Sequence, residues 1–297
     1  SSDAPSGSGF DKSFKALAPT GFSSPTSSAS TKVVTSIEGQ NLQHLLYGTS
    51  DAVYLTVSFW VKATVTGTYI LEIEQADASR HLSTAYTISS SNTWEKKTIT
   101  VVGDTSGTIN NDNGSGLSLK WFIAAGSIFT SGTLATTWAS TTTANRAVGQ
   151  VNGVASNNDA FYITGVQLEV GSQSTPFEHE PFEATLRKCQ RYYARSKNQA
   201  YASFFGGVGW ANTTSSWIGK GQIPVPMRSA PTLIYTGTAR VQNGQAGYNL
   251  TSFSVGLINT NSTTLSMGAG ASGLTLYRAH DVDAGASTAV MQLDAEL

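Results

Sequence analysis

Charged residues are scarce in this sequence: Asp, Glu, Lys and Arg make up 12% of its 297 residues, about half the share usual in soluble globular proteins. Ser, Thr, Asn and Gly take their place. The formal net charge is −1, which leaves no basic excess for binding a nucleic-acid backbone or an anionic membrane surface. We therefore expect partners with neutral or polar surfaces, and neither nucleic-acid binding nor membrane insertion.

Cysteine is almost absent, and the single Cys189 excludes an intrachain disulfide. The fold must then be held together by its core, which suits assembly in a reducing cytoplasm. Arg187 and Lys188 beside this thiol would favour a reactive thiolate, but no partner base is evident. We therefore expect Cys189 to be a small buried packing residue.

Long apolar runs are also missing. No segment approaches the roughly 18 residues of a membrane-spanning helix, and no secretory signal begins the sequence. The first residue is Ser1 rather than methionine, so we expect a longer parent chain.

The abundant residues favour short strands and tight turns, because Thr and Val suit a pleated sheet while Gly and Asn tolerate positive φ. Val53–Lys62 alternates between apolar and other residues most clearly, and we expect it to form a hairpin with Thr68–Glu74. The apolar phase of Phe161–Val170 changes midway, which predicts a β-bulge at Thr164 and Gly165. Two further strands of this half are expected at Lys97–Val102 and Leu117–Ile123.

The length suits two domains. We expect residues 1–30 to form an extended arm or a loop leading into the fold. We expect residues 31–177 to form a jelly-roll β-sandwich. A charged connector is expected over residues 178–199, in which Leu186–Ser196 fits either a short helix or a strand, and a smaller β-sandwich over residues 200–297. Its strands are expected at Ala200–Trp210, Ser216–Val225, Thr232–Tyr235, Asn249–Asn259, Gly273–His280 and Thr288–Leu297.

One combination of segments is more specific than any single motif: Phe161–Gly171, followed by Thr175–His179 and Cys189–Tyr193. Shorter segments accompany it in order, namely Ile37–Leu42, Phe59–Lys62, Thr93–Glu95, Met227–Thr232 and Leu293–Leu297. Together they resemble a cassette recurrent in bacteriophage tail-fibre and virion structural proteins. The resemblance implies a jelly roll like that of carbohydrate-binding modules, followed by a distal β-domain, in a virion protein that is often trimeric and often adhesive toward the host surface.

Common enzyme motifs are absent: the sequence has no nucleophile elbow, zinc-protease helix, phosphate loop or paired-cysteine metal spacing. We therefore expect no enzymatic activity. Glu72 and Glu74 share a strand face at a spacing compatible with glycoside hydrolysis. A solvated outer face explains this pair better.

Calcium is the one candidate cofactor. The polar turn Gly103–Gly116 offers oxygen-bearing side chains, namely Asp104, Asn110, Asp112 and Asn113. Against calcium, the resembled proteins often carry acidic residues on their last strand, where this chain has Thr164 and Gly165. The alternative is a turn whose side chains form hydrogen bonds with the backbone.

Aromatic side chains are the candidate glycan platforms, because ring faces stack on the apolar faces of sugars. Tyr54 and Trp60 lie opposite the aliphatic face of Val53–Lys62, and they predict either a groove or packing beneath the second sheet or a covering arm. A second group alternates with glycines, which suits host contact or, with slight preference, a subunit interface. It consists of Tyr201, Phe204, Phe205, Trp210 and Trp217.

The leading hypothesis is therefore a bacteriophage virion protein, assembled in the host cytoplasm. It would be part of a homotrimeric tail fibre that contacts other virion proteins and binds a host cell-surface glycan. A head, collar or tail decoration protein without an adhesive role is the alternative, and a polysaccharide-degrading tail spike is the least favoured.

Overall fold

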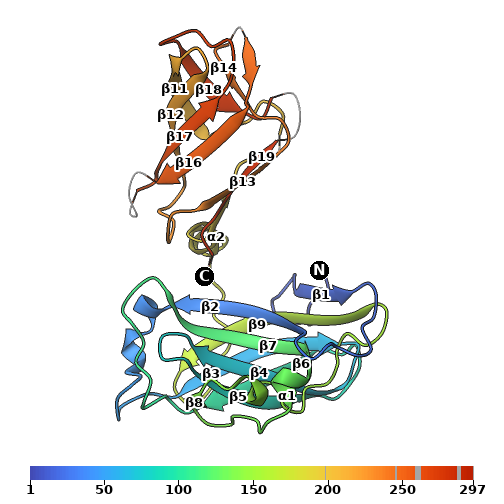
Figure 1. The fold of residues 1–297 in the computed structure, drawn as a ribbon. Helices are drawn as coiled ribbons and strands as arrows, with labels where there is room; N and C mark the ends of the chain where they lie inside the picture. Colours follow the sequence, from blue (N-terminus) through green and yellow to red (C-terminus); the bar gives the residue numbers. More distant parts are fainter. Residues whose placement is uncertain (198, 245, 258–261, 286–288, 297) are drawn as a thin grey trace. The chain divides into compact units, whose positions relative to one another are not determined.

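The computed structural model describes residues 1–296 apart from 198, 245, 258–261 and 286–288. The chain forms two compact units, Ser1–Glu178 and His179–Leu297. Both consist mainly of antiparallel strands (Figure 1). The predicted all-β class is confirmed.

The first unit is a two-layered sandwich. Its strands are β1 (Phe14–Ala18), β2 (Ser30–Glu38), β3 (Leu55–Ala63), β4 (Gly67–Gln75), β5 (Arg80–Ile88), β6 (Glu95–Val101), β7 (Ser115–Ala125), β8 (Ala139–Ser140) and β9 (Asp159–Val170). Its helical turns are η1 (Gly39–Asn41), η2 (Gln43–Leu45), α1 (Ser127–Thr130) and η3 (Thr143–Asn145). One sheet has the order β1-β9-β3-β6 and the other β2-β7-β4-β5-β8. Apart from the β4–β5 hairpin and the two-residue β8, successive strands pass from one sheet to the other, which is the connectivity of a jelly roll.

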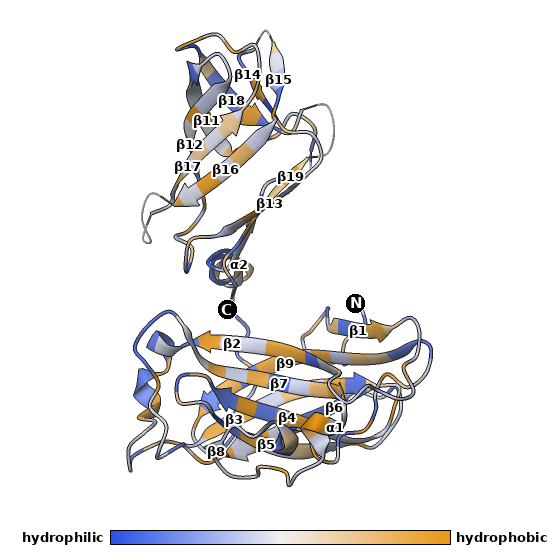
Figure 2. Ribbon diagram, in the orientation of Figure 1, coloured by the Kyte–Doolittle hydropathy of each residue, from blue (hydrophilic) through white to orange (hydrophobic). Residues whose placement is uncertain are grey.

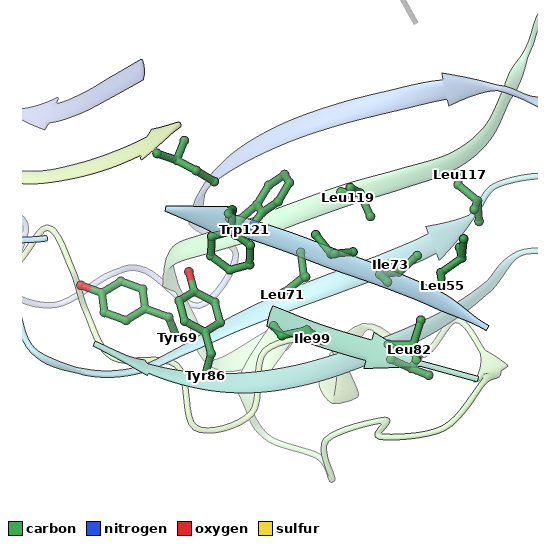
Figure 3. Close-up of a cluster of buried hydrophobic side chains, with 14 of the residues drawn as sticks. Leu55, Tyr69, Leu71, Ile73, Leu82, Tyr86, Ile99, Leu117, Leu119 and Trp121 are labelled. Carbon is green, nitrogen blue, oxygen red and sulfur yellow. The ribbon is translucent and has the colours of Figure 1, made fainter. Parts of the chain in front are cut away.

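The core lies between these sheets (Figure 3). Phe59 from β3 is fully buried, and its ring meets the Trp121 indole edge-on, with 5.6 Å between the ring centroids. Leu71 and Ile73 enter the same cluster from β4. Each such side chain contributes about 1.5–3 kcal/mol of burial free energy, so this layer accounts for much of the unit's stability.

The predicted β3–β4 hairpin is wrong. β3 pairs with β6 and β9, whereas β4 pairs with β5 and β7. The apolar faces of both strands contact the same core from opposite sides, and Thr64–Thr66 crosses between the layers. Alternation locates a strand and its buried face, but it does not determine the neighbour with which the strand pairs.

The predicted bulge in β9 is confirmed. Ser58 pairs with Gln167 and Trp60 with Thr164, so β9 contains one residue more than β3 between these two pairs. Gly165 lies in this interval with a φ of +57°, which glycine adopts without strain.

Residues 1–30 are more regular than expected, because β1 forms an edge strand that pairs with β9 from Phe14↔Ile163 to Ala18↔Asp159. A sequence rich in Ser, Gly and Pro does not reveal such a strand, whose partner lies more than 140 residues away. Residues 3 and 10 of the same segment also reach the outer face of this sheet, as described below.

In its described residues, the second unit contains helix α2 (Phe182–Gln190) and ten strands. They are β10 (Tyr193–Arg195), β11 (Ser203–Thr213), β12 (Ser216–Gln222), β13 (Thr232–Thr236), β14 (Arg240–Gln242), β15 (Gly247–Asn249), β16 (Ser252–Leu257), β17 (Thr264–Gly270), β18 (Ala279–Asp283) and β19 (Val290–Asp294). A three-stranded sheet, β10-β19-β13, and a seven-stranded sheet, β15-β14-β18-β11-β12-β17-β16, share one apolar core. Hydrophobic bands, drawn in orange, alternate with pale bands of intermediate hydropathy along β16 in Figure 2.

The segment Leu186–Ser196 contains both of the expected alternatives: the end of α2 and all of β10. Because β10 pairs with β19, the predicted charged connector, residues 178–199, belongs largely to the second unit. Strands β14 and β17 were not predicted. The strand expected at Gly273–His280 is wrong over most of its length, because residues 273–278 form no strand and β18 begins at Ala279. Parts of the strands expected at Asn249–Asn259 and Thr288–Leu297 lie outside the described residues.

Among the described residues, no helix combines the length and the apolar character needed to cross a membrane.

Candidate functional site

The outer face of the seven-stranded sheet in the second unit carries an exposed aromatic and aliphatic patch. Trp210 of β11 lies directly opposite Ile218 of β12, and Val208 lies opposite Lys220. All four side chains are exposed, Trp210 to 47%. Because alternate residues of a strand face opposite ways, these residues share one face while their neighbours enter the core.

Beside this patch lies a network of polar side chains on β14 and β18. Arg240 donates hydrogen bonds of 2.8 and 3.1 Å to the two carboxylate oxygens of Asp283, and a third of 3.1 Å to Gln242. The Gln242 amide in turn donates to Asp281 at 3.1 Å. Hydrogen bonding to Asp283 is the main cause that raises the pKa of Arg240. The polar atoms are therefore held in fixed positions on the same sheet face as Trp210.

Tyr201 extends this face toward the start of β11. Its side chain is 59% exposed, and its ring lies over the Arg240 guanidinium, 4.9 Å from ring centroid to guanidinium carbon. The Tyr201 backbone has a φ of +60°, and its N–H donates to the carbonyl of Gly285 at 2.8 Å. A non-glycine residue in this conformation is uncommon and needs such support from its surroundings.

A cavity of about 480 Å³ adjoins Tyr201. It is next to an irregularity of β11, where pairing with β18 shifts between Ser203 and Val208, and where Phe205 and Gly206 have φ values of +49° and +64°. Side chains that line the cavity include Arg195, Lys197, Gln199, Tyr201, Phe205 and Gln222. The cavity and the exposed patch thus lie on one continuous sheet face, because Gln222, Lys220 and Ile218 alternate along the exposed side of β12.

The predicted aromatic cluster is divided between this surface and the core. Tyr201 and Trp210 are exposed and Phe205 is half-buried, whereas Phe204 and Trp217 are fully buried. The predicted host or subunit contact is therefore wrong for Phe204 and Trp217, because strand parity turns them into the sandwich.

Sequence reasoning missed the polar members of the site. Arg240-Val241-Gln242 and Asp281-Val282-Asp283 each alternate polar, buried apolar, polar. This pattern indicates a strand with one polar face. It did not indicate that the two segments, about 40 residues apart, pair with each other.

The two predicted glycan-binding residues, Tyr54 and Trp60, do not form one platform. Tyr54 is exposed before the start of β3, and Trp60 lies six residues further along, a separation of roughly 20 Å at strand rise. Trp60 is half-buried, and both it and Phe10 of the N-terminal segment pack near Gly165. The alternative of packing beneath a covering arm thus describes Trp60 better than a groove does.

The N-terminal segment also covers the neighbouring part of this sheet face. Lys62 is paired with Asp3, and its ammonium group lies 4.5 Å from the Tyr162 ring centroid and 5.3 Å from that of Trp94. The Trp94 indole N–H donates to Asp3 at 3.0 Å. The charges and hydrogen-bonding groups of Asp3, Lys62 and Trp94 are thus already paired with one another, which favours a structural role for this face.

The proposed calcium ligands have other partners. Asp104 is buried, pairs with Arg80 at 2.6 Å and accepts a hydrogen bond from the Ser106 backbone. Asn110 donates to Asp77, and Asp112 caps its own turn by accepting from the Gly114 N–H at 2.7 Å. A guanidinium already neutralises the one buried carboxylate, so Asp104, Asn110 and Asp112 do not fit a calcium site.

Glu72 and Glu74 do not share a solvated face, contrary to our expectation. Glu72 is fully buried and accepts hydrogen bonds from Arg146 at 2.7 and 2.8 Å, while His81 lies 3.1 Å away. Glu74 pairs with Arg146 and Lys120. The long connection between β7 and β9, which carries Arg146, covers this face. Both carboxylates are committed to ion pairs, which gives no support to their use as a glycosidase pair.

Cys189 is exposed on α2, so the prediction that it is buried is wrong. Phe182 and Leu186 of the same helix are exposed as well, Phe182 to 74%. Residues at i, i+4 and i+7 lie along one helix face. An apolar stripe of Phe182, Leu186 and Cys189 therefore faces outward in the single chain.

No family model matches this sequence, and no curated protein is detectably similar to it.

Proposed function

We propose that the protein is a structural component of a bacteriophage virion, part of a tail fibre, and that its second unit binds a glycan of the host surface. The observation that carries the glycan proposal is the exposed Trp210, set beside the hydrogen-bonded Arg240, Gln242 and Asp281 on one sheet face. Aromatic faces stack on sugar rings, and fixed polar groups orient hydroxyls. The virion assignment is supported by the resemblance of Phe161–Tyr193 alone.

We further propose that the chain is a homotrimer assembled through α2. The outward stripe of Phe182 and Leu186 would be buried against the same stripe of other copies. Glu183 and Arg187 are both exposed on this helix, so each copy offers charges of both signs to its neighbours. Three weak glycan sites on one fibre would then gain avidity without any new contact.

The decisive experiment measures binding of the purified full chain to a panel of bacterial lipopolysaccharides, capsular polysaccharides and teichoic acids. We expect at least one to bind, and Trp210→Ala to weaken that binding about tenfold or more, since the tryptophans that dominate an interface commonly cost about 2 kcal/mol or more when truncated to alanine. Tyr54→Ala, an exposed aromatic residue of the first unit, is the matched control and should bind normally. A chain that binds no polysaccharide, or binding that survives Trp210→Ala, would refute the glycan proposal.

A further inference from the structure

We propose that the cavity beside Tyr201 selects an acidic sugar by receiving its carboxylate group. This inference rests on the proposed function, because the sugar would be one unit of the glycan that crosses the face around Trp210. It adds the chemical class of the ligand and assigns the selecting residues, Arg195 and Lys197.

The charge of the cavity is the first reason. Arg195 and Lys197 both line it, and no described lining residue is acidic. Both cations are exposed, and among the described residues neither has a carboxylate partner. The nearby Asp283 is buried and occupied by Arg240 and the Gly285 N–H. Two cations without a carboxylate partner among the described residues, in a concave site of a chain with net charge −1, favour an anionic group.

The uncharged lining fits the rest of a sugar. Tyr201 presents an exposed ring, and Phe205 adds a half-buried one. Gln199 and Gln222 offer both amide donors and carbonyl acceptors. A guanidinium can bind a carboxylate through two parallel hydrogen bonds while an aromatic ring stacks on the pyranose. A phosphate alone would use the cations and leave the rings and amides without a role.

The wall of the cavity is fixed before any ligand arrives. The backbone N–H of Ser196 donates to the Met291 carbonyl at 2.9 Å, and the Ser196 hydroxyl accepts from the Met291 N–H at 2.9 Å. On the other side, the Ala284 N–H donates to the Ala202 carbonyl at 3.1 Å. A site ordered in advance spends less free energy on ligand binding, which makes a shallow sugar site effective.

The distance along the sheet suits an oligosaccharide. Gln222 at the cavity and Ile218 opposite Trp210 are four residues apart on β12, roughly 13 Å at strand rise. A glycan of a few units can therefore stack on Trp210 while an acidic unit occupies the cavity.

The test compares bound polysaccharides with their carboxyl-reduced forms, in which each uronic acid becomes the neutral sugar of the same stereochemistry. We expect the tightest binder of the panel to contain a uronic acid, and its reduction to weaken binding at least tenfold at low salt. In the double variant Arg195→Gln/Lys197→Gln, the native and reduced forms should bind alike. Lys12→Gln/Lys96→Gln, which removes two exposed charges from the first unit, should keep the preference.

The outcomes separate this inference from the proposed function. If no polysaccharide binds, the proposed function itself fails. If the tightest binders are neutral, or if the double variant at Arg195 and Lys197 still prefers the native form, glycan binding stands and acid selection by this cavity is refuted.

Discussion

The ring of Tyr201 lies across the guanidinium of Arg240, 4.9 Å from ring centroid to guanidinium carbon, while the same guanidinium forms two hydrogen bonds with the buried Asp283. One side chain therefore connects the core of the second unit to its candidate glycan surface. Arg240 neutralises the carboxylate of Asp283, which has no contact with solvent. It also supports the ring of Tyr201, which is largely exposed.

Loss of this connection should destabilise the second unit. Arg240→Met leaves Asp283 buried without its cation, and removing one partner of a buried ion pair commonly costs about 3–5 kcal/mol. Urea denaturation of the full chain measures the loss. Arg195→Met removes an equally charged but exposed side chain and should change the free energy of unfolding by less than about 0.5 kcal/mol. Equal effects of the two substitutions would contradict the structural role assigned to Arg240.

Two tryptophans seven residues apart should behave in opposite ways. Trp217 is 0% exposed in the core, so Trp217→Ala should cost about 3–5 kcal/mol of stability. Trp210→Ala should leave the free energy of unfolding almost unchanged and act on polysaccharide binding instead. Thermal unfolding and binding measured on both variants separate the two roles. If Trp210→Ala destabilises as much as Trp217→Ala, then Trp210 is a packing residue.

Trp210 and Trp217 also show which features of the fold the sequence predicts and which it does not. Composition and alternation were sufficient to predict strands, turns, two sandwiches and the bulge at Gly165, because these depend on neighbours within a few residues. The face of the sheet on which Trp210 and Trp217 lie depends on which alternate residues of β11 and β12 point into the core. The glycines around them have no side chain that would indicate which face is buried. The sequence therefore grouped these aromatic residues but did not divide them into surface and core.

Long-range pairing is the main feature that the sequence did not reveal. Arg240 meets Asp283 because β14 pairs with β18, and Glu72 is buried because the connection carrying Arg146 folds over β4. A polar residue on an alternating strand is ordinarily solvated, and only the tertiary fold covers it. Glu72 was expected at the surface for this reason.

The buried Glu72 should make the first unit sensitive to acid. Burial opposes its ionisation, but hydrogen bonds from His81 and Arg146 outweigh this effect and hold the pKa of Glu72 below its usual range. A carboxylate whose pKa is lower in the folded state contributes stability above its unfolded pKa of about 4.3, and that contribution is lost as the pH falls through the folded value. Urea denaturation between pH 6 and pH 3 should show the decline.

The matched variants for acid sensitivity are Glu72→Gln and Asp51→Asn. Glu72→Gln should be less stable at pH 6, because Arg146 loses its buried partner, and it should lose less stability on acidification. Asp51 is an exposed carboxylate, so Asp51→Asn should keep the slope of the native chain. A slope that is unchanged in Glu72→Gln would show that other groups control the acid response.

The exposed stripe on α2 gives a prediction about assembly. If copies associate through Phe182 and Leu186, light scattering should give a mass of three times the 31.2 kDa of one chain. Leu186→Gln retains good helix propensity but replaces an apolar contact with an amide, so it should shift the mass toward the monomer and leave the circular dichroism spectrum unchanged. Lys188→Gln lies on the opposite side of the helix, about 160° from Leu186, and should remain trimeric. A native chain that is monomeric at micromolar concentration, or a Leu186→Gln variant that stays trimeric, would refute assembly through this helix.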